Sequence, residues 1–170
     1  MGIFSTGVQN PNGLHNGTSE RVRVIMRGGA GEKGQIVRFD FGASDGDVNL
    51  GFNNAEADAP ARNVLAATGD HAAGYILAVL EEDIADDAEG VAVIRGRVQI
   101  QGNGSIAPGT NFRVTVGASS RAIPAAPAAG AVGVDVLAIA READGAAGTL
   151  FWADFNGVEK LGHISPADDV

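Results

Sequence analysis

One phrase occurs twice in this chain, first at residues 34–44 and again at residues 109–119. The two segments read GQIVRFDFGAS and GTNFRVTVGAS, and they align without a gap. In both, apolar residues occupy every second position, which is the period of a β-strand with one buried face. A chain that encodes one strand pattern twice is expected to build its fold from two related units.

A second pair of related segments follows downstream. LAVLEE at residues 77–82 recurs as LAIARE at residues 137–142, and each copy precedes acidic and Ala-rich residues, a Gly and another strand-like run. Ala, Leu and Glu favour a helix in the first copy, but the second copy is short and flanked by Val and Ile, so we predict strands for both. The related units are therefore expected at about residues 31–100 and 106–160.

The remaining segments also favour strands. RVRVIMR at residues 21–27 alternates, and VAVIRGRVQI at residues 91–100 is apolar at first and then alternates. Short helical turns are possible at residues 61–67, and residues 122–133 are expected to form a loop because two prolines would interrupt a helix. About eight strands result. We predict an all-β fold, an antiparallel β-barrel or sandwich with an internal strand repeat and an extended N-terminal arm.

The C-terminal part predicts a closing hairpin. GTLFWADF ends at Phe155, Asn156-Gly157 suits the two positive φ angles of a type I′ turn, and VEKLGHI follows. Trp152 lies in the first strand of this hairpin. We expect its side chain to pack in the core.

The first 20 residues differ in composition from residues 21–170, which we expect to form a single β domain. They are rich in Gly, Asn and Ser, and their larger apolar side chains are Ile3, Phe4, Val8 and Leu14. Such a segment buries too little surface to order itself. It is either a frayed terminus or an arm that orders on a partner, with Ile3 and Phe4 as its anchor.

Charge and composition argue against several classes of partner. The chain carries 12 basic and 21 acidic residues, a net charge of −9, and no two basic residues are adjacent. Nucleic acid needs a continuous basic track and is therefore not an expected partner. No stretch approaches the roughly 20 apolar residues of a membrane span, so no membrane partner is expected. The absence of Cys excludes disulfides and thiolate chemistry.

No convergent set of catalytic residues stands out. His15, His71 and His163 lack the spacing of a metal pair on one element, and an Asp70-His71 couple is explained more simply as a solvated loop pair. We therefore expect no enzymatic activity and no cofactor. The acidic stretch is expected to be a solvated loop; it comprises Glu81, Glu82, Asp83, Asp86, Asp87 and Glu89.

One weak calcium candidate remains. Asp45, Asp47 and Asn49 alternate along the chain, and Glu56 stands where the last ligand of a calcium loop would be. Leu50 occupies the place of the Gly that such a loop requires, and helical flanks are missing. We therefore predict no resident metal.

The Gly-rich β repeats, the polar N-terminal segment and two longer stretches carry a resemblance. GYILAVLEEDIADDAEGVAVIRGRV at residues 74–98 and IAPGTNFRVTVGAS at residues 106–119 resemble the capsid decoration proteins of tailed bacteriophages, also called cement or head-stabilising proteins. The resemblance implies a non-enzymatic homotrimer, made in the host cytoplasm, that binds the major capsid protein on the outer surface of the virion and ties neighbouring capsomers together. Ile3, Phe4, Val8 and Leu14 are then hypothetical capsid contacts.

An alternative from another class is a ligand- or carbohydrate-binding β domain of a phage fibre or other surface structure. Such a domain depends on exposed aromatic side chains. The chain has one Trp, one Tyr and seven Phe, which is a poor supply, so the exposure of these few side chains decides between the two interpretations.

Overall fold

The computed structural model describes residues 19–39, 63–67, 76–126, 134–159 and 161–164, and all regular structure in these ranges is β. The predicted all-β, mostly antiparallel barrel fold is confirmed, while the predicted arm falls at residues 1–18, outside the described ranges. The strands are β1 (Glu20–Met26), β2 (Ile36–Phe39), β3 (Asn63–Ala66), β4 (Leu77–Leu80), β5 (Glu89–Asn103), β6 (Arg113–Val116), β7 (Ala122–Pro124), β8 (Val134–Val136), β9 (Ala138–Ala140), β10 (Ala147–Asn156) and β11 (Gly162–Ile164).

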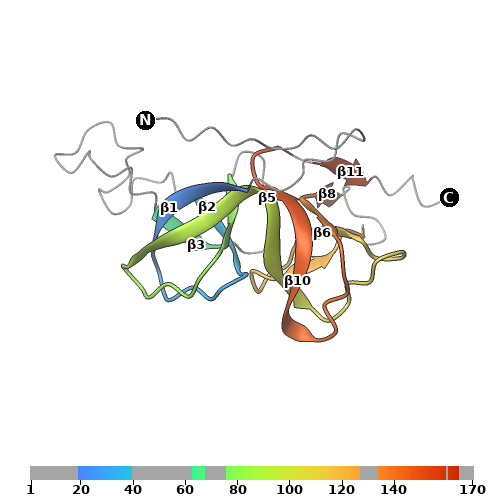
Figure 1. Ribbon diagram of the computed structural model, residues 1–170, viewed down its shortest axis with the longest axis horizontal. Helices are drawn as coiled ribbons and strands as arrows, with labels where there is room; N and C mark the ends of the chain where they lie inside the picture. The colour runs from blue at the N-terminus through green and yellow to red at the C-terminus, as the bar shows by residue number, and fades with distance from the viewer. Residues whose placement is uncertain (1–18, 40–62, 68–75, 127–133, 160, 165–170) are drawn as a thin grey trace.

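The strands close into two rings that share β5. Barrel 1 runs β1-β3-β2-β4-β5 and closes because β5 also pairs with β1; barrel 2 runs β5-β10-β9-β6-β7 and closes where Gly102 of β5 pairs with Ala122 of β7. Figure 1 shows β5 between the two groups of strands. Closure leaves neither ring with an unpaired edge.

The two barrels have the same pairing pattern. Strands β1, β3, β2, β4 and β5 of barrel 1 correspond in order to β5, β7, β6, β9 and β10 of barrel 2. In each ring one contact is parallel, β1 with β3 and β5 with β7, and the other four are antiparallel. The strand pattern repeated in the sequence therefore belongs to a repeated barrel.

The ungapped alignment of residues 34–44 with 109–119 holds in the turn but not in the strand. Gly34 and Gly109 both have positive φ, 82° and 100°, in equivalent turns. Val79 of LAVL faces Ile36, whereas Ile139 of LAIA faces Arg113, so Arg113 corresponds to Ile36 rather than to Arg38. The second copy has a longer turn here, and a shift of two residues leaves every side chain on its own face, so the alternating pattern conceals it.

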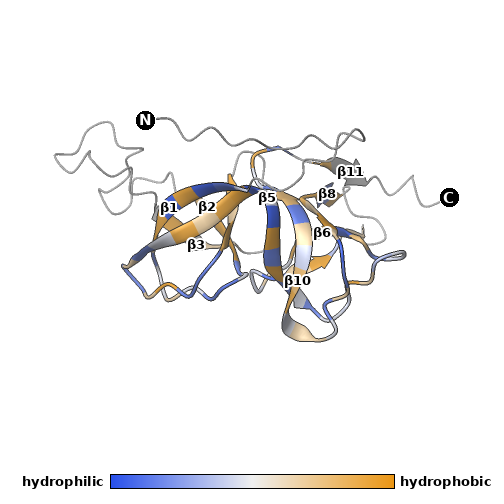
Figure 2. Ribbon diagram, in the orientation of Figure 1, coloured by the Kyte–Doolittle hydropathy of each residue, from blue (hydrophilic) through white to orange (hydrophobic). Residues whose placement is uncertain are grey.

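The long strand β5 changes barrels at its middle. Residues 89–95 pair with β1, residues 95–103 pair with β10, and Gly96 has a φ of 113°. An L side chain rarely adopts this conformation, so Gly permits the change of direction without strain. Figure 2 shows hydrophobic and hydrophilic residues alternating along the second half of the strand, after an apolar run in its first half.

Strand β4 is buried on both faces. Ala78 and Leu80 join the core inside barrel 1, whereas Leu77 and Val79 join the cluster that contains the interior of barrel 2. The outward side chains of β4 are thus covered by barrel 2. A strand between two cores reads as an unbroken apolar run, which explains why this segment resembles a helix in sequence.

Side-chain and backbone contacts also join the barrels. The Gln101 side-chain amide donates to Lys33 O at 2.9 Å and to a Glu32 carboxylate oxygen at 3.1 Å. Buried Ser120, at the turn between β6 and β7, donates its hydroxyl to Ala67 O at 2.6 Å, and its carbonyl accepts from Ile36 N–H. These two turns, one from each barrel, are therefore hydrogen-bonded to the other barrel.

Two local predictions are wrong. Within the possible helical turn at residues 61–67, Asn63–Ala66 is strand β3, which completes barrel 1, and residues 61 and 62 are outside the described ranges. The predicted hairpin does not form, because β11 pairs with β8. Gly157 instead lies between β4 and β5, where it donates to Ile94 O and accepts from Leu77 N–H. The Asn156 side-chain oxygen accepts from the N–H groups of Val158 and Glu159. The expected loop at residues 122–133 begins as strand β7, and residues 127–133 are outside the described ranges.

Candidate functional site

Most residues singled out in the sequence fall outside the described ranges. These are the hypothetical capsid contacts Ile3, Phe4, Val8 and Leu14, the calcium candidates Asp45, Asp47, Asn49 and Glu56, and the residues His15, Asp70 and His71. His163 lies in β11. Within the described ranges, no three His, Asp or Glu side chains are grouped as metal ligands. None of the described residues belongs to a helix long and apolar enough to cross a membrane.

The acidic stretch after β4 is only in part the expected solvated loop. Most of it is exposed, but Glu81 is half-buried, Glu89 belongs to β5, and several of its carboxylates pair with arginines. Arg21 pairs with Glu81 at 2.6 Å, Arg27 with Asp87 at 2.6 Å, and Arg23 with Glu89 at 3.0 Å. The hydrogen bonds that Arg21 donates to the Glu81 carboxylate, together with the negative charge of that carboxylate, raise the pKa of Arg21 above its ordinary value. Exposed pairs of this kind each contribute little to stability.

Trp152 is exposed, contrary to the prediction that it packs in the core. Its relative accessibility is 43%, whereas Phe151 and Ala153 on either side are fully buried. The alternation of β10 turns Trp152 outward together with Asp154. The signal was present in FWADF, because a strand that directs Asp154 to solvent directs Trp152 the same way.

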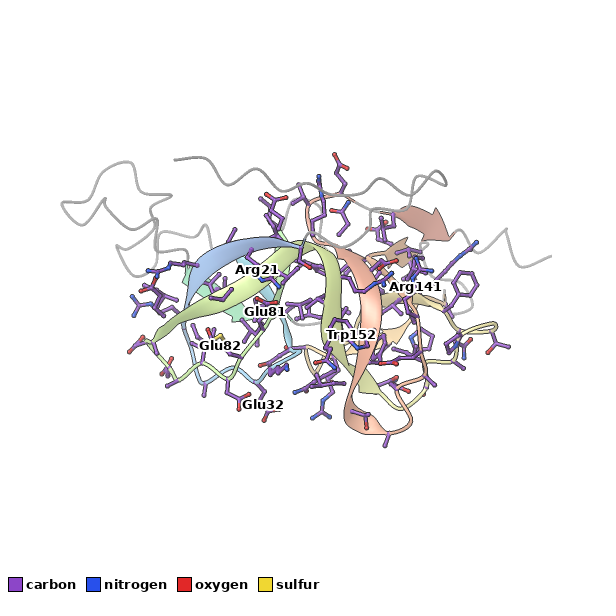
Figure 3. All side chains as sticks on the ribbon, in the orientation of Figure 1. Arg21, Glu32, Glu81, Glu82, Arg141 and Trp152 are labelled. Atoms are coloured by element: carbon purple, nitrogen blue, oxygen red, sulfur yellow. The ribbon has the colours of Figure 1, made fainter. Side chains whose placement is uncertain are left out.

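Charged side chains surround the indole. Asp154 holds two arginines, accepting from Arg97 Nε at 3.1 Å and from Arg141 Nε at 2.7 Å. Trp152, Arg97, Arg141 and Glu142 line an open depression of about 340 Å³. Figure 3 shows Trp152 and Arg141 on the barrel 2 side of the molecule. We call this surface, which comprises Arg97, Arg141, Glu142, Trp152 and Asp154, the Trp152 face.

The backbone of Trp152 is fixed on both sides. Its N–H donates to a Glu142 carboxylate oxygen at 2.9 Å, and its carbonyl accepts from Arg141 N–H at 2.8 Å. Val91, at the equivalent position of barrel 1, has the same two bonds, from its N–H to Glu82 at 3.0 Å and to its carbonyl from Glu81 N–H at 3.0 Å. The repeated LAVLEE and LAIARE segments thus supply the same clamp in both barrels.

The sequence matches no protein-family model and no curated protein. Among solved structures, the chain is similar to the N base of head fiber gp8.5 of bacteriophage phi29, with a TM-score of 0.49 and 13% sequence identity. The alignment covers 86% of this chain and 100% of that one.

Proposed function

We propose that the chain is a structural protein of a tailed-phage virion, which binds the outer surface of the assembled capsid and stabilises it by bridging neighbouring capsomers. The support from the sequence is its resemblance to decoration proteins at residues 74–98 and 106–119. This role needs no catalysis, and we propose that the protein is not an enzyme. The protein would be synthesised in the host cytoplasm, and its partner would be the major capsid protein.

The single structural observation that supports bridging is the fusion of two equivalent barrels through β5. The shared strand and the bonds of Gln101 and Ser120 hold the barrels at a fixed separation. A rigid body with two similarly built ends suits a lattice of repeated subunits. A protein that binds only the assembled lattice stabilises that state by mass action.

The experiment is co-sedimentation of the purified protein with undecorated heads of the phage that encodes it. We expect saturable retention on expanded heads and no binding to unassembled major capsid protein. Binding to neither form at a protein concentration well above that of the capsid sites would contradict the proposal. Retained protein should also raise the temperature at which the heads rupture.

We further propose that the protein acts as a homotrimer whose N-terminal arms contribute to capsid contact. Three tethered arms multiply weak contacts through effective concentration. Light scattering of the free and capsid-eluted protein measures the oligomeric state, and a monomer in both preparations would argue against a trimer.

The arm is tested by the double substitution Ile3→Ala and Phe4→Ala. Burying two such side chains contributes about 3–6 kcal/mol before the cost of ordering the arm is subtracted. We expect an unchanged melting temperature of the free protein and faster loss from heads after dilution. Equal retention of variant and parent would show that the barrels alone make the contact.

A further inference from the structure

Trp152 is exposed at a position where the fold does not require an aromatic residue. The equivalent position of barrel 1 holds Val91, and the backbone clamp there has nearly identical bond lengths. The clamp therefore forms without an indole. The side chain leaves 43% of its surface in solvent and is not needed for its own strand, so the indole is available to pack against a ligand.

The surroundings of Trp152 also differ from the equivalent surface of barrel 1. There Arg21 and Glu81, the equivalents of Arg97 and Arg141, form an exposed ion pair. The neighbouring outward residues Ile36, Val79 and Val93 are apolar and are buried against barrel 2. In barrel 2 the corresponding positions are Arg113, Ile139 and Asp154, and no described residue buries Arg113 or Trp152. An apolar barrel would leave Arg113 and Asp154 desolvated, so the Trp152 face does not suit a third barrel or a similar apolar surface.

The charges of the Trp152 face balance. Arg97 and Arg141 contribute two positive charges, Asp154 and Glu142 two negative charges, and both arginines already pair with Asp154. Anion binding would compete with these pairs. Each guanidinium nevertheless has five N–H donors, and a carboxylate has about four acceptor positions, so hydrogen-bonding capacity remains for a neutral polar ligand.

We propose that the Trp152 face binds a neutral oligosaccharide. One side of a pyranose ring presents C–H groups that pack on an indole, while its hydroxyl groups both donate and accept hydrogen bonds. The depression of about 340 Å³ lies in the usual volume range of small-molecule sites. It places Trp152 beside Arg97, Arg141 and Glu142, which supply donors and an acceptor around the ring. This inference does not depend on capsid binding.

Because the chain contains a single Trp, its one indole N–H resonance reports directly on this site. ¹⁵N-labelled protein would be titrated with maltohexaose, cellohexaose and mannohexaose, and with a sulfated oligosaccharide of the same length. We expect at least one neutral hexasaccharide to shift the indole resonance saturably, with a dissociation constant of about 1 mM or below. The sulfated compound should bind at least about tenfold more weakly.

Trp152→Val gives barrel 2 the residue that barrel 1 already tolerates, so the variant should fold. Saturation-transfer NMR, which observes the sugar, should show affinity reduced by about tenfold or more. Trp152→Phe should retain part of the affinity. Val158→Ala, which truncates an exposed apolar side chain beyond the end of β10, is the matched control and should bind as the parent does.

Three results would overturn the proposal. The first is that no neutral hexasaccharide shifts the indole resonance at a sugar concentration of about 20 mM. The second is that Trp152→Val binds the sugar as tightly as the parent does. The third is that the sulfated compound binds more tightly than every neutral one. A shift of the indole resonance on raising the protein concentration without sugar would instead show that a second copy of the chain covers this face.

Discussion

Gly157 shows how a single residue joins the two barrels. It follows β10 of barrel 2, yet its backbone bonds to Leu77 of β4 and Ile94 of β5. A Cβ at this position would lie 1.9 Å from the Leu77 carbonyl oxygen. The obstacle is backbone held in a paired strand, so the clash cannot be relieved by rotating a side chain.

We therefore expect Gly157→Ala to lower the free energy of unfolding by about 3 kcal/mol, from overpacking and the loss of one or both hydrogen bonds. Gly145→Ala is the control, because Gly145 has a φ of 64° and a Cβ added there would meet no atom within 4 Å. That substitution should cost only about 1 kcal/mol, the strain of a left-handed conformation. Urea denaturation compares the two variants, and equal losses would show that the close approach at Leu77 relaxes cheaply.

At the scale of the element, β5 is the strand on which both rings depend. It pairs with β1 and β4 up to Arg95 and with β10 from Arg95 onward, and it closes barrel 2 through β7. The φ of 113° at Gly96 marks where the strand leaves one barrel for the other. Strain at this point is expected to disturb both rings.

Gly96→Val should therefore destabilise the protein by about 2 kcal/mol, because a β-branched residue is forced into a backbone region that it rarely occupies. Gln99→Val on the same strand is the control, since Gln99 lies in regular pairing with Trp152, and its effect should stay within about 0.5 kcal/mol. Thermal melting followed by circular dichroism measures both. A Gly96→Val variant as stable as the control would mean that β5 can change barrels without glycine.

The sequence predicts the elements better than it predicts their connections. Alternation identifies β1 and β10, which bury alternate residues, and only parts of β5, where residues 92–94 and 100–102 are buried consecutively. It is ambiguous for β4, which lies between two cores, and it does not reveal the shared use of β5, since pairing partners leave no local signal. The Asn156-Gly157 hairpin is wrong for the same reason: a turn preference of a few tenths of a kcal/mol up to about 1 kcal/mol yields to long-range backbone pairing. The exposure of Trp152 could have been predicted from the sequence, because residues two apart on a strand share a face and Asp154 is expected to face solvent.

At the scale of the whole molecule, the two barrels are unlike separate domains joined by a linker. One hydrophobic cluster combines the interior of barrel 2 with the outer face of barrel 1, including Val79 and Val93. β5 contributes pairing to both rings. Unfolding either barrel would expose part of the core of the other, so the free energy of the two units cannot be separated.

We therefore predict one cooperative unfolding transition, which the single Trp makes testable. Trp152 belongs to barrel 2, whereas Leu80 is fully buried in the core of barrel 1. Leu80→Ala should lower stability by about 2–5 kcal/mol. If the barrels unfold together, Trp152 fluorescence and far-ultraviolet circular dichroism will move to the same lower urea midpoint, although the substitution lies in the other barrel. Phe151 lies in the cluster that joins the interior of barrel 2 to the outward residues of barrel 1. Phe151→Ala should therefore lower the urea midpoints of both signals together. A fluorescence midpoint that stays at its parent value in Leu80→Ala, while circular dichroism becomes biphasic, would show instead that barrel 2 is stable without barrel 1.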